Sequence, residues 1–397
     1  MPEPLSNPRR GFICAAFALL VAMVGTTLPT PLYVMYQHQL GFGETWLTLI
    51  FSIYAAGVIA ALLAVGSWSD QLGRKPMLLA GLAMGAISAG IFLSADSIGA
   101  LLLGRLFSGF SAGIMTGTAT VAVIELAPKA WNKSATLMAT AANMFGLGLG
   151  PLLAGFTSQQ LPEPLHLVFW LHLGLLAMAA AGLLLARETV KRPAKLRLGF
   201  QRPSIPAQVR PLFIPAAIAG LAGFSIAGLF TSMVPSIMRQ LLEQSSGLVI
   251  GAVIGLFFAA SVVGQAALQW LPQRLHMTIG CIGLMIGMLA LGVSINTQQL
   301  AWLIGAGFCA GAGQGMVFRA GMGAVAMASP PDRKAAVTSA LFVLFYISMS
   351  LPVIAVGVCV PLFGLKYVGE LFSGLVALVA LLAMFSMRRA QARAQAA

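Results

Sequence analysis

The chain has 397 residues, of which 59% are hydrophobic and only 8% are charged. Soluble domains carry roughly 25% charged residues, and a fold of this length cannot hide so much apolar surface from water. The composition therefore excludes a soluble enzyme. It indicates a polytopic membrane protein with room for about a dozen spans of ~20 residues each.

The formal net charge of +13 does not indicate a nucleic-acid-binding protein, because no segment could fold into a polar surface that gathers the basic residues. The four cysteines lie in apolar stretches without metal-binding spacing, so we expect no metal site and no disulfide framework. The sequence also contains no phosphate-binding loop. We therefore expect no cofactor, and we exclude ATP as the energy source.

Apolar runs with few charges predict twelve membrane-spanning helices. In chain order they are 12–34, 45–66, 76–95, 98–124, 133–157, 166–187, 212–238, 247–268, 274–294, 300–326, 335–360 and 366–387. The first run follows Arg9 and Arg10, as a secretory signal would. It has no obvious cleavage site, however, and is interpreted as a spanning helix. The stretch 275–318 carries no charge and is too long for one span, so the polar residues 294–299 are expected to divide it.

The distribution of lysine and arginine predicts the orientation of these spans. Nineteen of the 23 fall on alternate connections and at the two ends of the chain, whereas Arg239 and Lys366 lie on the opposite side. Basic residues favour the cytoplasmic side. The pattern therefore predicts a multi-pass protein of the cytoplasmic (inner) membrane with both termini in the cytoplasm.

The longest polar segment lies between the sixth and seventh spans and is basic and rich in proline. We interpret residues 188–211 as a cytoplasmic linker between two six-helix halves, 1–187 and 212–397. An internal similarity with an offset of 201 supports this division, because Gly104 and Pro151 align with Gly305 and Pro352. Parallel halves of this kind are typical of transporters, with the substrate site at their interface.

The connection after the second span reads GSWSDQLGRKP and combines an acid, two bases and two glycines. By itself it could be an ordinary positive loop with an Asp at a helix end. Its spacing in a twelve-span chain resembles the signature loop of the major facilitator superfamily. The resemblance implies a cytoplasmic gate formed by Gly66, Asp70, Gly73, Arg74 and Lys75. In the family this acid lies near the start of the eleventh span when the cytoplasmic side is closed, which would place Asp70 near residues 335–339.

Two further stretches extend the resemblance. The fourth span carries Arg105 in the sequence RLFSGFSAG, which is similar to the arginine-containing fourth helix of the family. The fifth span resembles the glycine–proline motif of the family's antiporters, many of which export drugs, although Ala154 replaces one of its glycines. The alternative is simple packing and a kink, which small residues and a proline allow in any membrane helix. The residues of this motif are Gly146, Gly150, Pro151 and Gly155.

Ionisable residues inside spans are functional candidates, because a charged side chain in a bilayer is costly. Arg105 and Arg319 are the two basic ones. Snorkelling to the surface is the alternative for Arg105, and a structural ion pair is the alternative for Arg319. Candidates for the coupling proton are Glu125, His172 and Glu370. Polar and aromatic side chains that could line a central cavity are Thr27, Tyr33, Tyr54, Asn143, Gln265, Gln314 and Tyr346.

These observations predict a secondary active transporter that works by alternating access and exports a small organic molecule in exchange for protons. It is expected to act as a monomer in the lipid bilayer. The intramembrane arginines favour a neutral or anionic substrate. Two alternatives remain open: an importer of a sugar or organic anion on the same fold, and a non-transporting receptor or scaffold, which the gate loop and duplicated halves disfavour.

Overall fold

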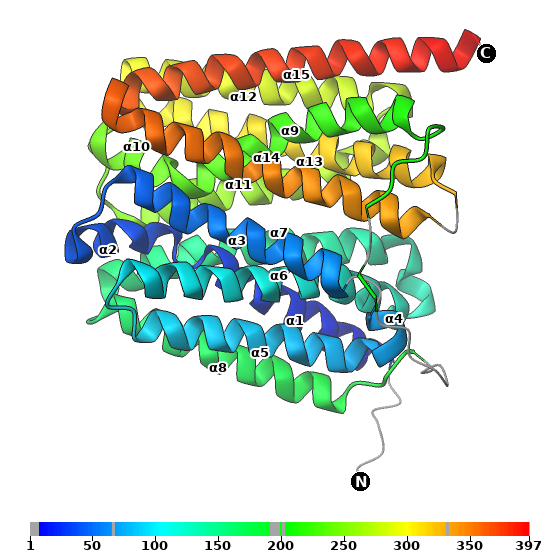
Figure 1. Cartoon of the computed structure of the whole chain (residues 1–397), viewed down its shortest axis with the longest axis horizontal. Helices are drawn as coiled ribbons and strands as arrows, with labels where there is room; N and C mark the ends of the chain where they lie inside the picture. The colour runs from blue at the N-terminus through cyan, green and yellow to red at the C-terminus, as the bar shows by residue number, and fades with distance from the viewer. Residues whose placement is uncertain (1–7, 66–67, 191–198, 201–202, 331–332, 397) are drawn as a thin grey trace. The chain divides into compact units, whose positions relative to one another are not determined.

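The computed structural model describes residues 8–65, 68–190, 199–200, 203–330 and 333–396. These residues form helices joined by short connections, without a strand among them (Figure 1). In this described part, twelve helices are long and apolar enough to cross a membrane. The expected all-α fold with twelve spans is therefore confirmed.

Within the described residues the chain divides into two compact units. Unit 1 comprises Met1–Leu32 with Ile53–Gln201, and unit 2 comprises Tyr33–Ser52 with Arg202–Ala397. The main division falls inside the linker expected at 188–211. In addition, residues 33–52 pack with the second unit, although the sequence groups them with the first half.

Hydrogen bonds explain why residues 33–52 belong to unit 2. The Glu44 carboxylate accepts hydrogen bonds from Ser236 Oγ (3.1 Å) and from Gln240 Nε2 (2.9 Å). Thr45 Oγ1 donates to the carbonyl oxygen of Gly357 (2.9 Å). The start of the second span is therefore fixed to elements from the C-terminal part of the chain.

The helices of unit 1 run back and forth along one direction. They are α1 (Pro8–Thr27), the second part of α3 (Glu44–Val65), α4 (Ser69–Leu72), α5 (Arg74–Leu93), α6 (Ile98–Leu126), α7 (Asn132–Gln160) and α8 (Pro164–Leu185). Unit 2 contains α2 (Tyr33–Leu40), the first part of α3, α9 (Arg210–Ser232), α10 (Val234–Gln240), α11 (Gly247–Ala267), α12 (His276–Thr297), α13 (Leu300–Ala328), α14 (Lys334–Phe363) and α15 (Leu365–Ala396).

Prolines interrupt two of the expected spans. The first span breaks after α1, where Pro29 and Pro31 precede α2, and the seventh breaks between α9 and α10 at Pro235. Proline lacks the amide hydrogen that a continuous helix needs, so the chain resumes as a separate helix at each point. The expected division of 275–318 is also observed, because α12 ends at Thr297 and α13 begins at Leu300.

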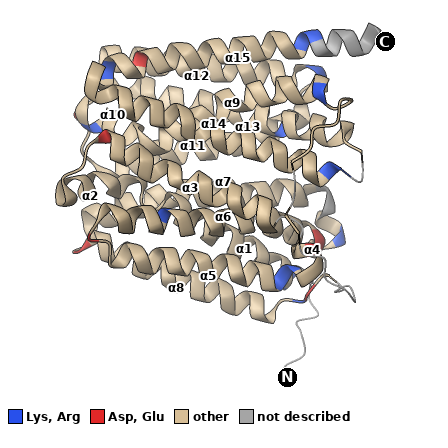
Figure 2. Cartoon of the chain, viewed as in Figure 1, with Lys and Arg blue, Asp and Glu red and all other residues tan. Residues whose placement is uncertain are grey.

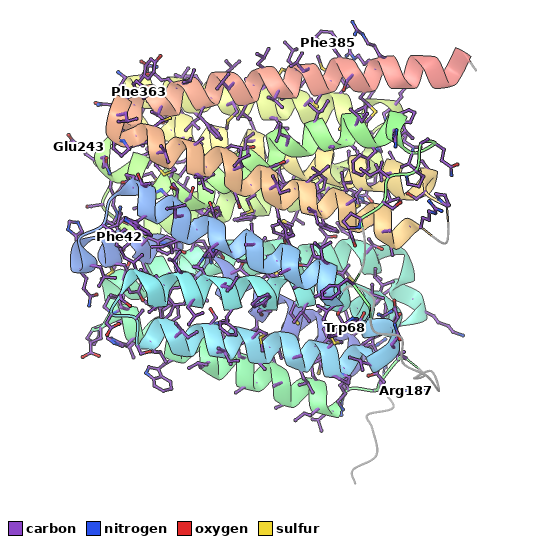
Figure 3. The ribbon with its side chains drawn as sticks, viewed as in Figure 1. Phe42, Trp68, Arg187, Glu243, Phe363 and Phe385 are labelled. Carbon is purple, nitrogen blue, oxygen red and sulfur yellow. The ribbon has the colours of Figure 1, made fainter. Side chains whose placement is uncertain are left out.

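One stripe of α15 is apolar and exposed. Leu371, Leu375, Leu378, Leu382 and Phe385 recur at helical spacing, and each is about half exposed. Figure 3 shows the Phe385 side chain directed away from the bundle. A continuous apolar stripe of this kind is suited to contact with lipid tails, because exposure of apolar side chains to water is unfavourable.

Charged residues concentrate at the ends of the helices (Figure 2). In unit 2, all three described acidic residues, Glu44, Glu243 and Glu370, lie at the end that contains α10 and the start of α15. The opposite end carries basic residues, which include Arg210 at the start of α9 and Arg388 near the end of α15. We call this opposite end the basic end of unit 2.

Candidate functional site

The predicted gate loop lies between α3 and α5 and contains the short helix α4. Gly73, between α4 and α5, has a φ of +107°, a left-handed conformation that side chains rarely adopt. This turn places Arg74 and Lys75 at the first two positions of α5. Gly66, the first glycine of the predicted motif, lies outside the described residues.

Arg74 is the centre of a charged network in this loop. Its guanidinium contacts the carboxylate of Asp70 (2.6 Å) and that of Glu125 on α6 (3.0 Å), and its Nη1 donates to Ser69 Oγ (2.7 Å). Arg74 is 9% exposed, whereas the Asp70 side chain is 62% exposed. The planar guanidinium, with its five donors, therefore joins the loop to α6.

Glu188 adds an anion to the start of α5. Its carboxylate accepts hydrogen bonds from the backbone amides of Arg74 (2.9 Å) and Lys75 (3.0 Å). It also accepts bonds from the amides of the two residues that follow it, Thr189 (2.9 Å) and Val190 (3.0 Å). The first amides of a helix have no partner within the helix and favour a negative charge. Glu188 supplies both an acceptor and that charge.

Gly73 leaves the space that Glu188 occupies. A Cβ atom at this position would lie 2.6 Å from Glu188 Oε2 and 2.9 Å from its carboxyl carbon. Two physical constraints therefore favour glycine at this position of the motif. They are the positive φ and the close approach of the Glu188 carboxylate. The sequence does not identify Glu188, because this residue is distant in the chain and follows the sixth span without a motif of its own.

Lys75 makes the reciprocal contact. Its ammonium donates to the carbonyl oxygens of Leu184 and Ala186, at the end of α8 (3.4 Å to Ala186). A cation at the C-terminal end of a helix is favourable for the same reason that an anion is favourable at the start. The Glu188 carboxylate and the Lys75 ammonium therefore connect the start of α5 to the end of α8.

Glu125, a proton candidate, is engaged at both oxygens. Oε1 accepts from Arg74 Nη2 (3.0 Å), and Oε2 accepts from Arg74 Nε (3.3 Å) and from Thr189 Oγ1 (2.6 Å). These partners favour the ionised form of the carboxylate. The network thus contains α4, α5, α6 and the residues that follow α8.

Arg105 is fully buried in unit 1, with 1% of its surface exposed. Its guanidinium carbon lies 4.7 Å from the centre of the Tyr54 ring on α3, and its Nη1 donates to the carbonyl oxygen of Thr26 at the end of α1. Stacking of a guanidinium on an aromatic face is a favourable cation–π contact. The structure therefore brings together two candidates, Arg105 and Tyr54, at the meeting point of α1, α3 and α6.

The glycine motif of α7 packs on α1. A Cβ on Gly146 would lie 2.5 Å from the carbonyl oxygen of Leu20, and one on Gly150 would lie 2.5 Å from that of Val24. Thr27 Oγ1 donates to the carbonyl oxygen of Leu147 (2.8 Å). Pro151 lies inside α7, and both Pro151 and Gly155 are buried. Small residues at these positions let the two helix backbones touch.

His172 of α8 is buried against α1. Its Nε2 lies 3.1 Å from the carbonyl oxygen of Val21, and its ring lines a small cavity with Ser88 and Ser108. Arg105 and His172 thus bind two carbonyl oxygens of the same helix. Both contacts are internal to unit 1.

In unit 2, four polar side chains form a chain of hydrogen bonds between α11 and α13. Arg319 Nη1 donates to the carbonyl oxygen of Gln265 (2.7 Å), Gln265 Nε2 donates to Ser261 Oγ (3.4 Å), and Ser261 Oγ donates to Gln314 Oε1 (2.7 Å). Gln265, Ser261 and Gln314 are buried, whereas Arg319 is exposed. Arg319 and Gln314 therefore share one network in unit 2, whereas Arg105 belongs to unit 1.

The remaining candidates are Tyr346, Asn143 and Glu370. Tyr346 of α14 lies beside Phe224 of α9, with ring centres 6.4 Å apart. Asn143 is half-buried on α7. Glu370 lies in the second turn of α15, and its buried Oε1 has no hydrogen-bond partner among the described residues. Groups of three or more metal-binding side chains are likewise absent from the described part of the chain.

Comparison with known proteins gives consistent results. A family model described as the Major Facilitator Superfamily matches residues 15–353. Multidrug resistance protein 1 of Bacillus subtilis is 23% identical over 283 residues, or 70% of each chain. Chloramphenicol resistance protein of Pseudomonas aeruginosa is 28% identical over 272 residues, which are 66% of this chain and 64% of that relative.

Solved structures share the fold. The human organic anion transporter MFSD10 (TETRAN) superposes with a TM-score of 0.69 at 19% identity, over 98% of this chain and 100% of its own. A bacterial homologue of the human lysosomal transporter Spinster, in an inward-facing and unoccupied conformation, gives a TM-score of 0.77 at 14% identity. That match covers 97% of this chain and 98% of the homologue. At these identities the similarity concerns the fold alone.

Proposed function

The chain belongs to the major facilitator superfamily of membrane transporters, and from this premise we propose that it is a proton-coupled exporter of a small neutral or anionic organic molecule. Transport by alternating access requires at least two conformations that exchange during the cycle. The names of relatives, which include two drug resistance proteins, favour export over the alternative of import.

The network around Arg74 carries this proposal. It concentrates one buried guanidinium, three carboxylates and two helix ends within a single loop region. Charged contacts that can form and break are a common basis for switching between two discrete states. A scaffold has no need of such a switch.

Glu125 is the proton carrier that this geometry supports best. Protonation would remove the negative charge that binds Arg74, so uptake of a proton would weaken the connection between the gate loop and α6. Binding of a proton and release of the gate would then be one event. We propose this role for Glu125 ahead of His172 and Glu370, which lie outside the network.

Arg105 supports the assignment of substrate charge. It lies seven residues into α6, about 10 Å along the helix at 1.5 Å per residue, and its charge acts in a region of low dielectric constant. Such a site repels cations and attracts anionic or polar neutral groups. Chloramphenicol, after which one relative is named, is a neutral molecule of this kind.

We also propose a cytoplasmic-membrane location, a monomer, and both termini in the cytoplasm. The concentration of lysine and arginine at one end of the helices supports the orientation. Cysteines introduced at residue 187 and residue 366 would test it. Labelling of intact cells by a membrane-impermeant maleimide should modify only the cysteine at 366.

Uptake into inverted membrane vesicles, acidified inside by respiration, tests the function. Labelled chloramphenicol, benzoate-like anions and ethidium would be compared in wild-type vesicles and in Asp70→Asn vesicles with equal protein content. We expect uptake of a neutral or anionic compound. This uptake should stop when the pH gradient is dissipated, and it should be lower in the variant. Preferred uptake of ethidium would contradict the substrate class, and uptake that is independent of the pH gradient would contradict the coupling.

A further inference from the structure

Arg319 lies on α13, on the face between the contacts that this helix makes with α11 and with α12. It lies four residues after Gly315, where a Cβ atom would touch the backbone of Ser261 on α11, and three residues after Met316, which contacts α12 at Gly280. Residues three and four apart lie on the same face of a helix. The hydrogen bond from Arg319 to the Gln265 carbonyl (2.7 Å) fixes the guanidinium beside α11.

Arg319 lies at the level of the connection between α11 and α12. Gln265 lies two residues before the end of α11. On α12, Met277 lies 3.5 Å from a Cβ built on Gly321, so Arg319 is level with the first turn of that helix. From Arg319, α13 continues for nine more residues, about 13 Å at 1.5 Å per residue. Arg319 is therefore at the level of a helix connection, with the end of α13 projecting beyond it.

Two exposed side chains of this connection lie at the same level. Trp270 lies three residues after the end of α11 and is 75% exposed, and Arg274 lies two residues before the start of α12 and is also exposed. Tryptophan is enriched where membrane helices meet the headgroup region. Two guanidinium groups and an exposed indole at the level of a membrane helix end are suited to binding a lipid headgroup.

Other basic residues reinforce the positive charge. Gly369 of α15 contacts Ile295 of α12. These two helices are antiparallel. Arg388 is nineteen residues after Gly369, and His276 is nineteen residues before Ile295, so Arg388 and His276 lie at the same level. The described acidic residues of unit 2 all lie at the opposite end. Among the described residues, no carboxylate lies within ion-pair distance of Arg319, so its charge has a carbonyl as partner and no protein anion.

We propose that Gln265, Trp270, Arg274 and Arg319, at the connection between α11 and α12, form a site that binds the phosphate of an anionic phospholipid. The Arg319 guanidinium uses one nitrogen for the Gln265 carbonyl and presents the others to the phosphate, and Arg274 adds a second cation. The indole of Trp270 lies at the headgroup level. The acyl chains extend along the exposed apolar surface of the bundle. Arg319 would then anchor the lipid and have no contact with the substrate.

Native mass spectrometry of the purified full chain in detergent tests this proposal. The protein would be titrated with dioleoyl-phosphatidylglycerol, with dioleoyl-phosphatidylcholine and with sodium phosphate. We expect retention of phosphatidylglycerol by the wild type and about fivefold weaker retention by Arg319→Gln, from the loss of one basic contact. Arg210→Gln removes one exposed charge from the same basic end and should retain the lipid like the wild type.

Three results would overturn the assignment. Equal retention by Arg319→Gln and the wild type would show that Arg319 is not part of a lipid site, and equal loss in Arg210→Gln would show only a diffuse attraction. Sodium phosphate that displaces the bound phosphatidylglycerol at millimolar concentration would identify free phosphate as the ligand. If Arg319→Gln fails to give a monodisperse protein, Arg274→Gln and Trp270→Ala replace it. Full retention by both of them would equally overturn the proposal.

Discussion

The Glu188 carboxylate caps the helix that begins at Arg74, with 2.9 Å between Oε1 and the Arg74 amide nitrogen. The same arginine binds Asp70 and Glu125 through its side chain. Glu188 therefore fixes the backbone of the residue whose side chain organises the gate loop. A carboxylate at the first residue of the expected linker thus belongs to the same site as the loop between α3 and α5.

Replacing Glu188 should weaken unit 1. Glu188→Ala removes the acceptor for two amides of α5 and the charge that favours this helix end, so we expect a loss of about 1–2 kcal/mol in stability. The melting temperature of the purified protein in detergent measures this loss. Asp96→Ala removes an exposed acid from another connection of unit 1 and serves as the control, with no change expected.

Gly73→Ala should mimic the loss of Glu188. The new Cβ would displace the Glu188 carboxylate and would hold a non-glycine residue at φ +107°, for a cost of about 1–3 kcal/mol. Combined with Glu188→Ala, it should cost less than the sum of the two, because the clash is then absent. Strict additivity would contradict this coupling. Gly117→Ala, at a helical glycine with open space, should leave the melting temperature unchanged or raise it.

Arg74→Lys should impair transport although the charge is retained. A lysine ammonium cannot reproduce the planar fork that binds Asp70, Ser69 and Glu125 together. We expect the transport rate to fall severalfold. The effect on stability should be only about 1 kcal/mol, because Asp70 and Glu125 are partly exposed. Vesicle uptake normalised to protein content measures the rate, and Arg187→Lys, at an exposed residue, should transport like the wild type.

Gly150→Ala should separate α1 from α7. The added methyl group would lie 2.5 Å from the Val24 carbonyl oxygen and would meet Thr27 as well. Overpacking of this kind costs about 1–3 kcal/mol, and a lower melting temperature is the expected readout. Gly174→Ala on α8 meets no atom within 4 Å. If both variants melt at the same temperature, the close contact of α1 and α7 does not contribute to stability.

Much of the fold follows from the sequence because apolar runs and charged connections alone determine the spans. The twelve helices agree with the expected ones to within a few residues, except where α2 and α10 continue past a proline break and where α15 extends nine residues further, to Ala396. The grouping of residues 33–52 with unit 2 could not be predicted. It depends on side-chain contacts such as Glu44 with Ser236, which connect distant parts of the chain and leave no periodic pattern.

The site was partly predictable for the same reason. Asp70, Gly73, Arg74 and Lys75 are adjacent in the chain, so their spacing identifies them. Glu188 acts through backbone amides, which every residue possesses, so no pattern of residue types marks its partner. Arg319 was expected as a substrate residue because it lies within a span. Its level in the fold depends on how far α13 extends beyond α11 and α12, which a single helix sequence does not reveal.

Proton counterflow in proteoliposomes is the most direct test of the central claim, that this chain couples proton movement to export through the Arg74–Glu125 pair. Purified protein would be reconstituted with a pH-sensitive dye inside the liposomes, and substrate identified from vesicle uptake would be added outside. We expect substrate influx to drive protons out and to make the interior alkaline. Glu125→Gln should abolish this pH change, while substrate exchange between the two sides continues. Substrate entry without any pH change in the wild type, or an undiminished pH change in Glu125→Gln, would contradict this claim.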